Sequence, residues 1–254
     1  MPELEECSGY NYLKETAYDR ATVKTIKRPA IAQAATFKAY PEAAKVELPR
    51  IWQLAEARIT PLLQKRRSLR RFMMEPIKLE ELAFMLWASQ GITAKSGDYS
   101  FRTAPSAGAL YPVETYLSAN LVEGLDPGLY HFDVENFSLD RLSSEDSAEA
   151  VAAACLDQKF MAQSAVCFLW SAVFRRCMTK YGNRGIRYVL LDAGHICQNL
   201  LVAAEATGCG GCPVAAFYDN EMNDLLQLDP GEESVLYAAA VGKKVVSKGA
   251  HCSL

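Results

Sequence analysis

The sequence lacks an excess of charge of either sign, and it lacks long apolar stretches. Its 254 residues hold 27 Lys and Arg against 30 Asp and Glu, a formal net charge of −3. This balance gives no general attraction to nucleic acid or to a membrane, and we expect neither as a partner. The longest apolar run, around residues 165–174, is too short to cross a bilayer as a helix. The acidic start, Met1 to Glu6, has no apolar core of a secretory signal, so we expect a cytoplasmic protein.

Histidine is also scarce, and the chain holds His131, His195 and His251. No Ser-His-Asp arrangement, P-loop or His-Glu-x-x-His zinc motif is present. The usual signatures of serine hydrolases, P-loop NTPases and zinc metalloproteases are therefore missing. His131 alternates with apolar neighbours, which predicts the wetter face of a strand. His195 lies inside a helical pattern and is predicted to be a hydrogen-bonded core residue.

Cysteine is present but forms no compact framework. The eight cysteines are scattered through apolar segments, which indicates a reducing compartment. Cys209 and Cys212 form a C-x-x-C pair without a second pair at matching spacing. Zinc would need His195 or Cys197 as further ligands, so no metal site is expected.

Length and composition predict one folded unit preceded by an arm. Half of the residues are hydrophobic, and a chain of this length buries a sizeable core without disulfides. Residues 1–48 are weakly periodic and punctuated by prolines, which indicates an extended N-terminal arm. Residues 49–254 carry the patterned segments and form the predicted domain.

The hydrophobic pattern alternates between the helical and the strand period. Helices are predicted from Ile51, from Leu79 to a stop at Gly91, over 148–155, over 184–207 and after a cap at Asp219. The apolar stripe of the long fourth helix includes Leu190. Strands are predicted at 113–119, 128–134, 165–173, 214–217 and 235–241, with a short one through Leu139 and a polar loop at 96–103. This order indicates an α+β fold with helices against a mixed sheet.

Positive charge is concentrated in one short segment. Arg66, Arg67, Arg70 and Arg71 lie within six positions around Ser68. Guanidinium groups match the oxygens of a phosphate, and Ser68 adds a hydroxyl and a backbone N–H. The alternative is a solvated helix end.

Three further segments combine small or reactive residues. Residues 105–112 place small residues between two prolines, which lets a flat ligand approach the backbone; a tight turn is the alternative. Lys180 and Tyr181 form a plausible acid/base pair, or else Lys180 is solvated and Tyr181 packs. Residues 208–211 are rich in glycine but follow a helix and precede a strand. That order is the reverse of a dinucleotide-binding fingerprint, so a Rossmann site is not expected.

Taken together and in order, these motifs resemble the FMN-dependent nitroreductase family, most closely its SagB-type dehydrogenase branch, which includes azoline oxidases. The most specific string is Pro-Ser-Ala-Gly-Ala-Leu-Tyr-Pro at 105–112, and the resemblance runs from about Arg50 to Lys243. It implies a three-layer α/β/α fold with a mixed, mainly antiparallel sheet. It also implies a homodimer with FMN at the subunit interface.

The resemblance assigns roles to particular residues. It implies that the cofactor is bound by Arg66, Arg67, Ser68, Arg70, Pro105, Ser106, Ala107, Gly108, Leu110, Gly208, Cys209, Gly210, Gly211 and Lys243. Lys180 and Tyr181 match the pair that serves catalysis in the azoline oxidases. The expected activity is two-electron hydride transfer at flavin N5, to or from a small or peptide-borne planar substrate. A stand-alone nitro or quinone reductase using NAD(P)H and a flavin-storage protein without its own substrate remain alternatives.

Overall fold

The computed structural model describes residues 6–21, 23, 30–52, 57–97 and 99–245. Its centre is a seven-stranded sheet in the order β1-β8-β7-β5-β9-β11-β10. Each neighbouring pair in this sheet is antiparallel. The strands are β1 (Ala44–Glu47), β5 (Val113–Ala119), β7 (Gly128–Asp133), β8 (Ser138–Ser143), β9 (Val166–Val173), β10 (Cys209–Val214) and β11 (Glu233–Lys243). A parallel pairing occurs between two short strands outside this sheet, β2 (Ile77–Lys78) and β6 (Val122–Glu123).

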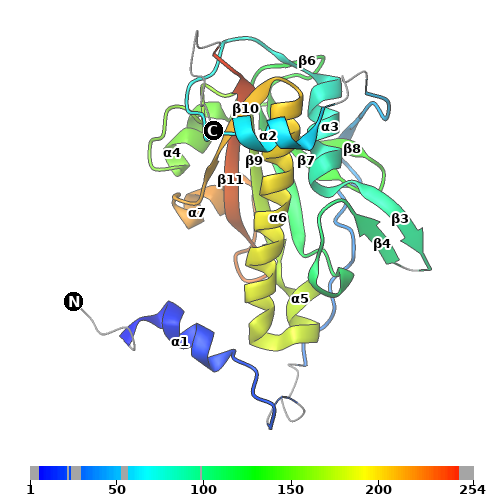
Figure 1. Ribbon diagram of the computed structural model, residues 1–254, viewed down its shortest axis with the longest axis vertical. Helices are drawn as coiled ribbons and strands as arrows, with labels where there is room; N and C mark the ends of the chain where they lie inside the picture. Colours follow the sequence, from blue (N-terminus) through cyan, green and yellow to red (C-terminus); the bar gives the residue numbers. More distant parts are fainter. Residues whose placement is uncertain (1–5, 22, 24–29, 53–56, 98, 246–254) are drawn as a thin grey trace.

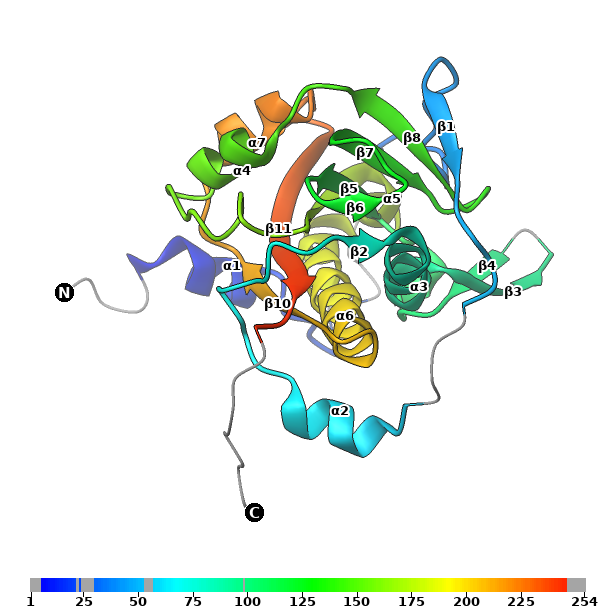
Figure 2. The same ribbon diagram turned by 90° about the horizontal axis from the view of Figure 1, so that it is seen from above.

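Helices cover both faces of the sheet, as the predicted three-layer α+β architecture requires (Figure 2). Helices α3 (Leu79–Gln90) and α6 (Gly185–Ala206) cover one face, and α4 (Ala148–Ala154) and α7 (Asp219–Leu225) cover the other. The continuous apolar run of β9 follows from this position. Phe168 and Trp170 enter the core under α6, whereas Cys167 and Leu169 enter the core under α4. A central strand buried on both faces needs apolar residues at every position.

The long helix α6 confirms the predicted helix over 184–207 and ends before Gly208, whose φ is 73°. One position of its predicted stripe is wrong, because Leu190 is 52% exposed. His195 is also exposed and not a core residue. Leu190 is in line with the buried Cys197 and Leu201 but lies nearer the start of α6, where the described residues leave this surface uncovered. The exposed surface there, which includes Leu190, Leu191 and His195, is called the outward side of α6.

Three other predictions are corrected by the structure. Residues 96–103 are not a loop but belong mostly to a hairpin of β3 (Ile92–Ser96) and β4 (Tyr99–Arg102). The strand predicted at 214–217 lies earlier, as β10, and includes Gly210 and Gly211, which were predicted to precede it. His131 is fully buried, because the neighbouring strands β5 and β8 supply its polar partners, Glu114 and Asp140, inside the protein.

The helices near the predicted site are short. Helix α2 (Ile59–Lys65) follows the non-helical residues Ile51 and Trp52; the rest of the helix predicted from Ile51 falls partly on residues 53–56, outside the described part. Helix α5 (Phe174–Tyr181) was not predicted, and it carries Lys180 at its end. Asp219, which was predicted to cap the next helix, is instead the first residue of α7, and Tyr218 occupies the cap position.

The N-terminal segment extends away from the body of the protein (Figure 1). Helix α1 (Ser8–Glu15) is tied to the start of α6 by Arg187, which donates to the Leu13 carbonyl over 3.1 Å and to the Thr16 hydroxyl over 2.9 Å. Strand β1, inside residues 1–48, pairs with β8 in the main sheet. None of the described helices combines the length and the apolar character that crossing a bilayer requires.

Candidate functional site

The arginine-rich segment lies along the edge of the main sheet beside the glycine-rich strand. It leaves α2 at Arg66, and Ser68 then pairs in parallel with Gly211 of β10. The Leu69 N–H donates to the Gly211 carbonyl over 3.0 Å. A Cβ built on Gly210 would lie 2.5 Å from the Leu69 side chain, so the absence of a side chain at Gly210 leaves room for Leu69. The structure therefore places the arginine-rich segment, which is predicted to bind the phosphate, beside residues 208–211, which are also predicted to bind the cofactor.

The charge of this segment is available to a ligand. Arg66 is half-buried, and Arg67 and Arg70 are exposed. Among the ion pairs of the described residues, none involves these three guanidinium groups. Arg67 donates to the carbonyls of Gln64 and Arg66, which keeps it at the end of α2. Three cations with free donors suit a doubly charged phosphate.

Lys243 lies at the same edge, but its ammonium group already has a carboxylate partner. The Met73 N–H donates to the Lys243 carbonyl over 2.9 Å. The Lys243 ammonium is 2.6 Å from Glu81. Lys244 likewise pairs with Glu205. A phosphate contact by Lys243 stays a prediction, and it would have to share this cation with Glu81.

The second predicted segment, residues 105–110, is held at the other end of α6 (Figure 1). The Ser106 hydroxyl donates to Asp192 over 2.5 Å and accepts from the Tyr111 N–H over 2.9 Å. The backbone has positive φ at Gly108, Ala109 and Tyr111. Such conformations cost free energy and persist where the surroundings impose them, which is common at functional sites. Ser106 and Asp192 impose this loop on the start of β5.

Lys180 and Tyr181 reach this same loop. A Cβ built on Gly108 would lie 2.6 Å from the Lys180 ammonium and 2.6 Å from the Tyr181 hydroxyl. The absence of a side chain at Gly108, whose φ is 67°, thus leaves room for both polar groups. Tyr181 packs edge-on against Tyr188, with ring centres 4.8 Å apart. The exposed Lys180 and the half-buried Tyr181 therefore converge over the predicted ring-lining loop.

The two groups of residues are apart within one chain. Asp192 anchors the 105–110 loop, and Leu201 of the same helix is 3.1 Å from a Cβ built on Gly211. Nine residues of an α-helix make two and a half turns and span about 13 Å. These two side chains consequently leave α6 on opposite faces.

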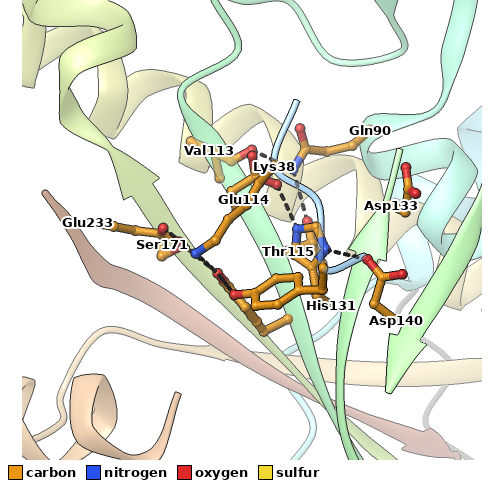
Figure 3. Close-up of polar contacts among 12 residues, drawn as sticks. Lys38, Gln90, Val113, Glu114, Thr115, His131, Asp133, Asp140, Ser171 and Glu233 are labelled. Carbon is orange, nitrogen blue, oxygen red and sulfur yellow. Dashed lines mark hydrogen bonds and ion pairs between the residues drawn. The ribbon is translucent and has the colours of Figure 1, made fainter. Parts of the chain in front are cut away.

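A buried polar network lies behind the loop, and sequence reasoning missed it (Figure 3). His131 is 3.0 Å from Glu114 and 3.3 Å from Asp140. Glu114 also accepts from Arg176 over 2.5 Å. Arg176 in turn donates to the Tyr111 carbonyl over 3.2 Å. The network links the loop to the sheet, and its signal in the sequence is a carboxylate and a histidine inside apolar strands.

Each member of this network is charged for a physical reason. Burial alone raises the pKa of Glu114, but the His131 hydrogen bond and the Arg176 charge outweigh it and lower the pKa to about 2. Burial lowers the pKa of His131, yet its hydrogen bonds to Asp140 and Glu114 raise the pKa above its ordinary value. The buried network therefore contains an imidazolium between two carboxylates.

The C-x-x-C pair does not form a joint site. Cys209 and Cys212 lie in β10, where residues three apart point to opposite faces. Cys209 belongs to the core under α6, and Cys212 belongs to the core under α4. In the described residues, no three His, Cys, Asp or Glu side chains are grouped as metal ligands.

Comparison with known proteins agrees with this arrangement. A protein of Methanocaldococcus jannaschii that bears a nitroreductase name is 36% identical over 201 residues, which is 79% of this chain and 97% of that protein. The trifolitoxin-processing protein TfxB of Rhizobium leguminosarum bv. trifolii is 28% identical over 58% of this chain, which spans only 40% of TfxB. The similarity to TfxB agrees with the resemblance to the SagB-type branch.

The fold is shared with solved structures. A crystal structure from Anabaena variabilis with a nitroreductase name has a TM-score of 0.72 and 26% sequence identity. The match covers 91% of this chain and 45% of that chain. The model of the nitroreductase family matches residues 63–243, which includes every segment that forms the two groups of site residues. The chain is therefore a member of the nitroreductase family of oxidoreductases.

Proposed function

We propose that the protein is an FMN-dependent oxidoreductase that acts on a small or peptide-borne planar substrate. The observation that carries the proposal is the arginine segment, without ion pairs to the described residues and joined to β10 by the Ser68–Gly211 pairing. Arg66 and Arg70 bind the phosphate of the cofactor. When bound, FMN supplies two-electron redox chemistry, which the protein directs by orientation and electrostatics.

The absorbance spectrum of the purified protein tests this proposal directly. Oxidised flavin bands, with FMN released on denaturation, are the expected result. Reduction by NADH or NADPH followed by reoxidation with a quinone, a nitro compound or an azoline-containing peptide then identifies the acceptor or substrate class. Protein that reduces but turns over no member of the panel would favour flavin storage. A chain purified without flavin, and unable to bind added FMN, would reject the proposal.

We further propose that the active unit is a homodimer. Within one chain the arginine segment and the 105–110 loop lie on opposite faces of α6. In the proposed dimer, each site combines the arginine segment of one chain with the 105–110 loop of the other. The outward side of α6 carries Leu190 and Leu191, 52% and 55% exposed. Gly194, next along this side, has open space around it. A glycine inside a helix costs about 1 kcal/mol relative to alanine, and close packing of another chain would compensate for it.

Substitution of Leu191 by Arg tests this interface. We expect the variant to run as a monomer in size-exclusion chromatography with light scattering and to lose most of its FMN, because a buried charge disfavours association. Tyr218→Arg is the matched control, since Tyr218 is 49% exposed on the opposite face of the sheet. A dimeric, fully loaded Leu191→Arg variant would show that α6 is not the interface.

Lys180 and Tyr181 serve as the proton-handling pair of the reaction. Their polar groups converge over Gly108, and Lys180 is exposed to the approaching substrate. Lys180→Ala should keep bound FMN and lower turnover of the true substrate by about 10²- to 10⁴-fold, the usual contribution of a positioned acid or base. Lys159→Ala, which removes another exposed lysine, should turn over normally. Unchanged turnover in Lys180→Ala would leave the pair a structural role only.

A further inference from the structure

A small cavity lies on the other side of the loop that carries Ala109 and Tyr111. Its volume is about 200 Å³, and its walls include the side chains of Phe37, Tyr99, Arg102 and Arg176. A water molecule occupies roughly 30 Å³ of the liquid, so the cavity holds a small organic molecule but not a nucleotide. In the described part of the chain, no acidic side chain lines this cavity.

Arg102 is a buried cation that has no carboxylate partner in the part of the chain that the structure describes. The residue is 7% exposed. Its guanidinium donates to Gln90 over 2.8 Å, and its Nε has no hydrogen-bond partner. Within the described residues it takes part in no ion pair. Arginine is almost never buried unless it is paired, because an uncompensated charge loses its hydration.

The nearest carboxylate is already committed elsewhere. Glu114 is bonded to Arg176 over 2.5 Å and lies 3.0 Å from the charged His131. Arg176 also donates to the carbonyls of Ala35 and Tyr111. The cavity therefore has two guanidinium groups in its wall, and only Arg176 is directly paired with Glu114. One positive charge remains to be balanced by a ligand.

The aromatic walls indicate the shape of that ligand. The Arg102 guanidinium lies 4.6 Å from the centre of the Tyr111 ring and 5.6 Å from that of Phe37. Tyr99, at the rim, is 60% exposed. Flat apolar walls around a fork of donors favour a planar group that ends in a planar anion.

From this arrangement we infer that the cavity is a binding site for the carboxylate of a small organic acid, with Arg102 as its main charged contact. The site is separate from the arginine segment at residues 66–70. It stands on the charge and shape of the cavity and does not depend on flavin binding. Because Tyr111 and Ala109 belong to the loop held by Ser106, a bound acid contacts the back of that loop.

Calorimetric titration of the full-length protein tests the inference with formate, acetate and benzoate. Formamide, acetamide and benzamide are the neutral counterparts of the same shapes. We expect saturable binding of at least one carboxylate and binding at least about tenfold weaker by its amide. Loss of a hydrogen bond to a charged group costs about 1.5–3 kcal/mol, which corresponds to roughly a 10- to 150-fold loss of affinity.

Variants locate the site. Arg102→Gln should weaken carboxylate binding by at least about tenfold, and Arg102→Lys should weaken it less because the charge remains. Arg175→Gln is the matched control, since Arg175 pairs with Glu232 and does not line the cavity. It should bind as the wild type does.

Three results would overturn the inference: no carboxylate binds, the amides bind equally well, or Arg102→Gln binds like the wild type. If Arg102→Gln does not fold, a crystal of the wild type soaked with 4-bromobenzoate decides. An anomalous bromine peak in the cavity supports the site, and its absence from the cavity rejects it. The titration does not monitor flavin, so failure of the FMN proposal leaves a distinct signature, namely colourless protein that still binds the acid.

Discussion

The double substitution Arg66→Ala and Arg70→Ala is expected to yield protein that is purified without FMN. In the proposed site each guanidinium would form a charge-assisted contact with the phosphate, and such a contact contributes about 1.5–3 kcal/mol. Loss of both lowers the affinity for FMN by roughly 10²- to 10⁴-fold. Titration of the apoprotein with FMN, followed by quenching of flavin fluorescence, measures this loss.

A matched control removes the same number of charges nearby. Arg58 and Arg71 are both exposed and flank the segment that pairs with β10. Arg58→Ala with Arg71→Ala should reduce the affinity only slightly, and mostly at low salt, because exposed charges that do not contact the phosphate are screened. If the Arg66/Arg70 variant retained FMN at the stoichiometry of the wild type, the phosphate would have to bind elsewhere.

Glu114→Gln is expected to cause the largest loss of stability. The carboxylate lies between the His131 imidazolium and the Arg176 guanidinium, and all three groups are buried. Removal of one partner from a buried ion pair leaves an uncompensated charge and costs about 3–5 kcal/mol. At roughly 2–4 °C per kcal/mol for a chain of this size, the melting temperature should fall by about 6–20 °C. Thermal unfolding followed by circular dichroism measures the change.

The pH dependence of this loss follows from the pKa of Glu114. The ordinary value of 4.5 is lowered to about 2 in the folded protein by His131 and Arg176, which outweigh burial. The stability contributed by this carboxylate is therefore fully present above pH 4.5 and is lost as the pH falls toward 2. Glutamine does not titrate, so the difference between the two proteins should shrink over that range. Glu145→Gln, at an exposed position, is the control and should melt like the wild type at neutral pH.

Equal unfolding free energies for the wild type and Glu114→Gln would show that the network contributes no net stability. A double-mutant cycle with Arg176→Met then separates the pair from its surroundings. Because Met leaves no charge to be compensated, the double variant should be less destabilised than the sum of the two single variants.

Local patterns identified most elements of the fold because those elements are decided by short-range periodicity. The 3.6-residue stripe of α6 and the apolar run of β9 both report how a segment meets the core. The same rule failed at Leu190, because an apolar residue on the outward side of α6 extends the pattern without being buried in this chain. It failed again at β10, where glycines that usually mark a turn instead allow Leu69 to approach the strand.

The candidate site was predicted in its parts but not in its arrangement. The arginine cluster and the 105–112 string stand out as short motifs. The contacts that hold the site together join residues far apart in the sequence. Ser106 bonds to Asp192, 86 positions on, and Arg176 bonds to Glu114, 62 positions back. Arg102 showed no signal, because a single arginine in a polar segment normally faces water.

The sequence by itself determined the composition class, the long helix α6 and the buried strand β9, and the motifs that chemistry needs. These features depend on neighbours within one or two turns of chain, where side-chain spacing decides which face is buried. Only the tertiary structure decided which motifs meet: Ser68 with Gly211, Gly108 with Lys180 and Tyr181, and Arg102 with an open cavity. Such contacts depend on how the antiparallel sheet orders its strands and on the length and facing of α6. Neither is encoded in the spacing of any one segment.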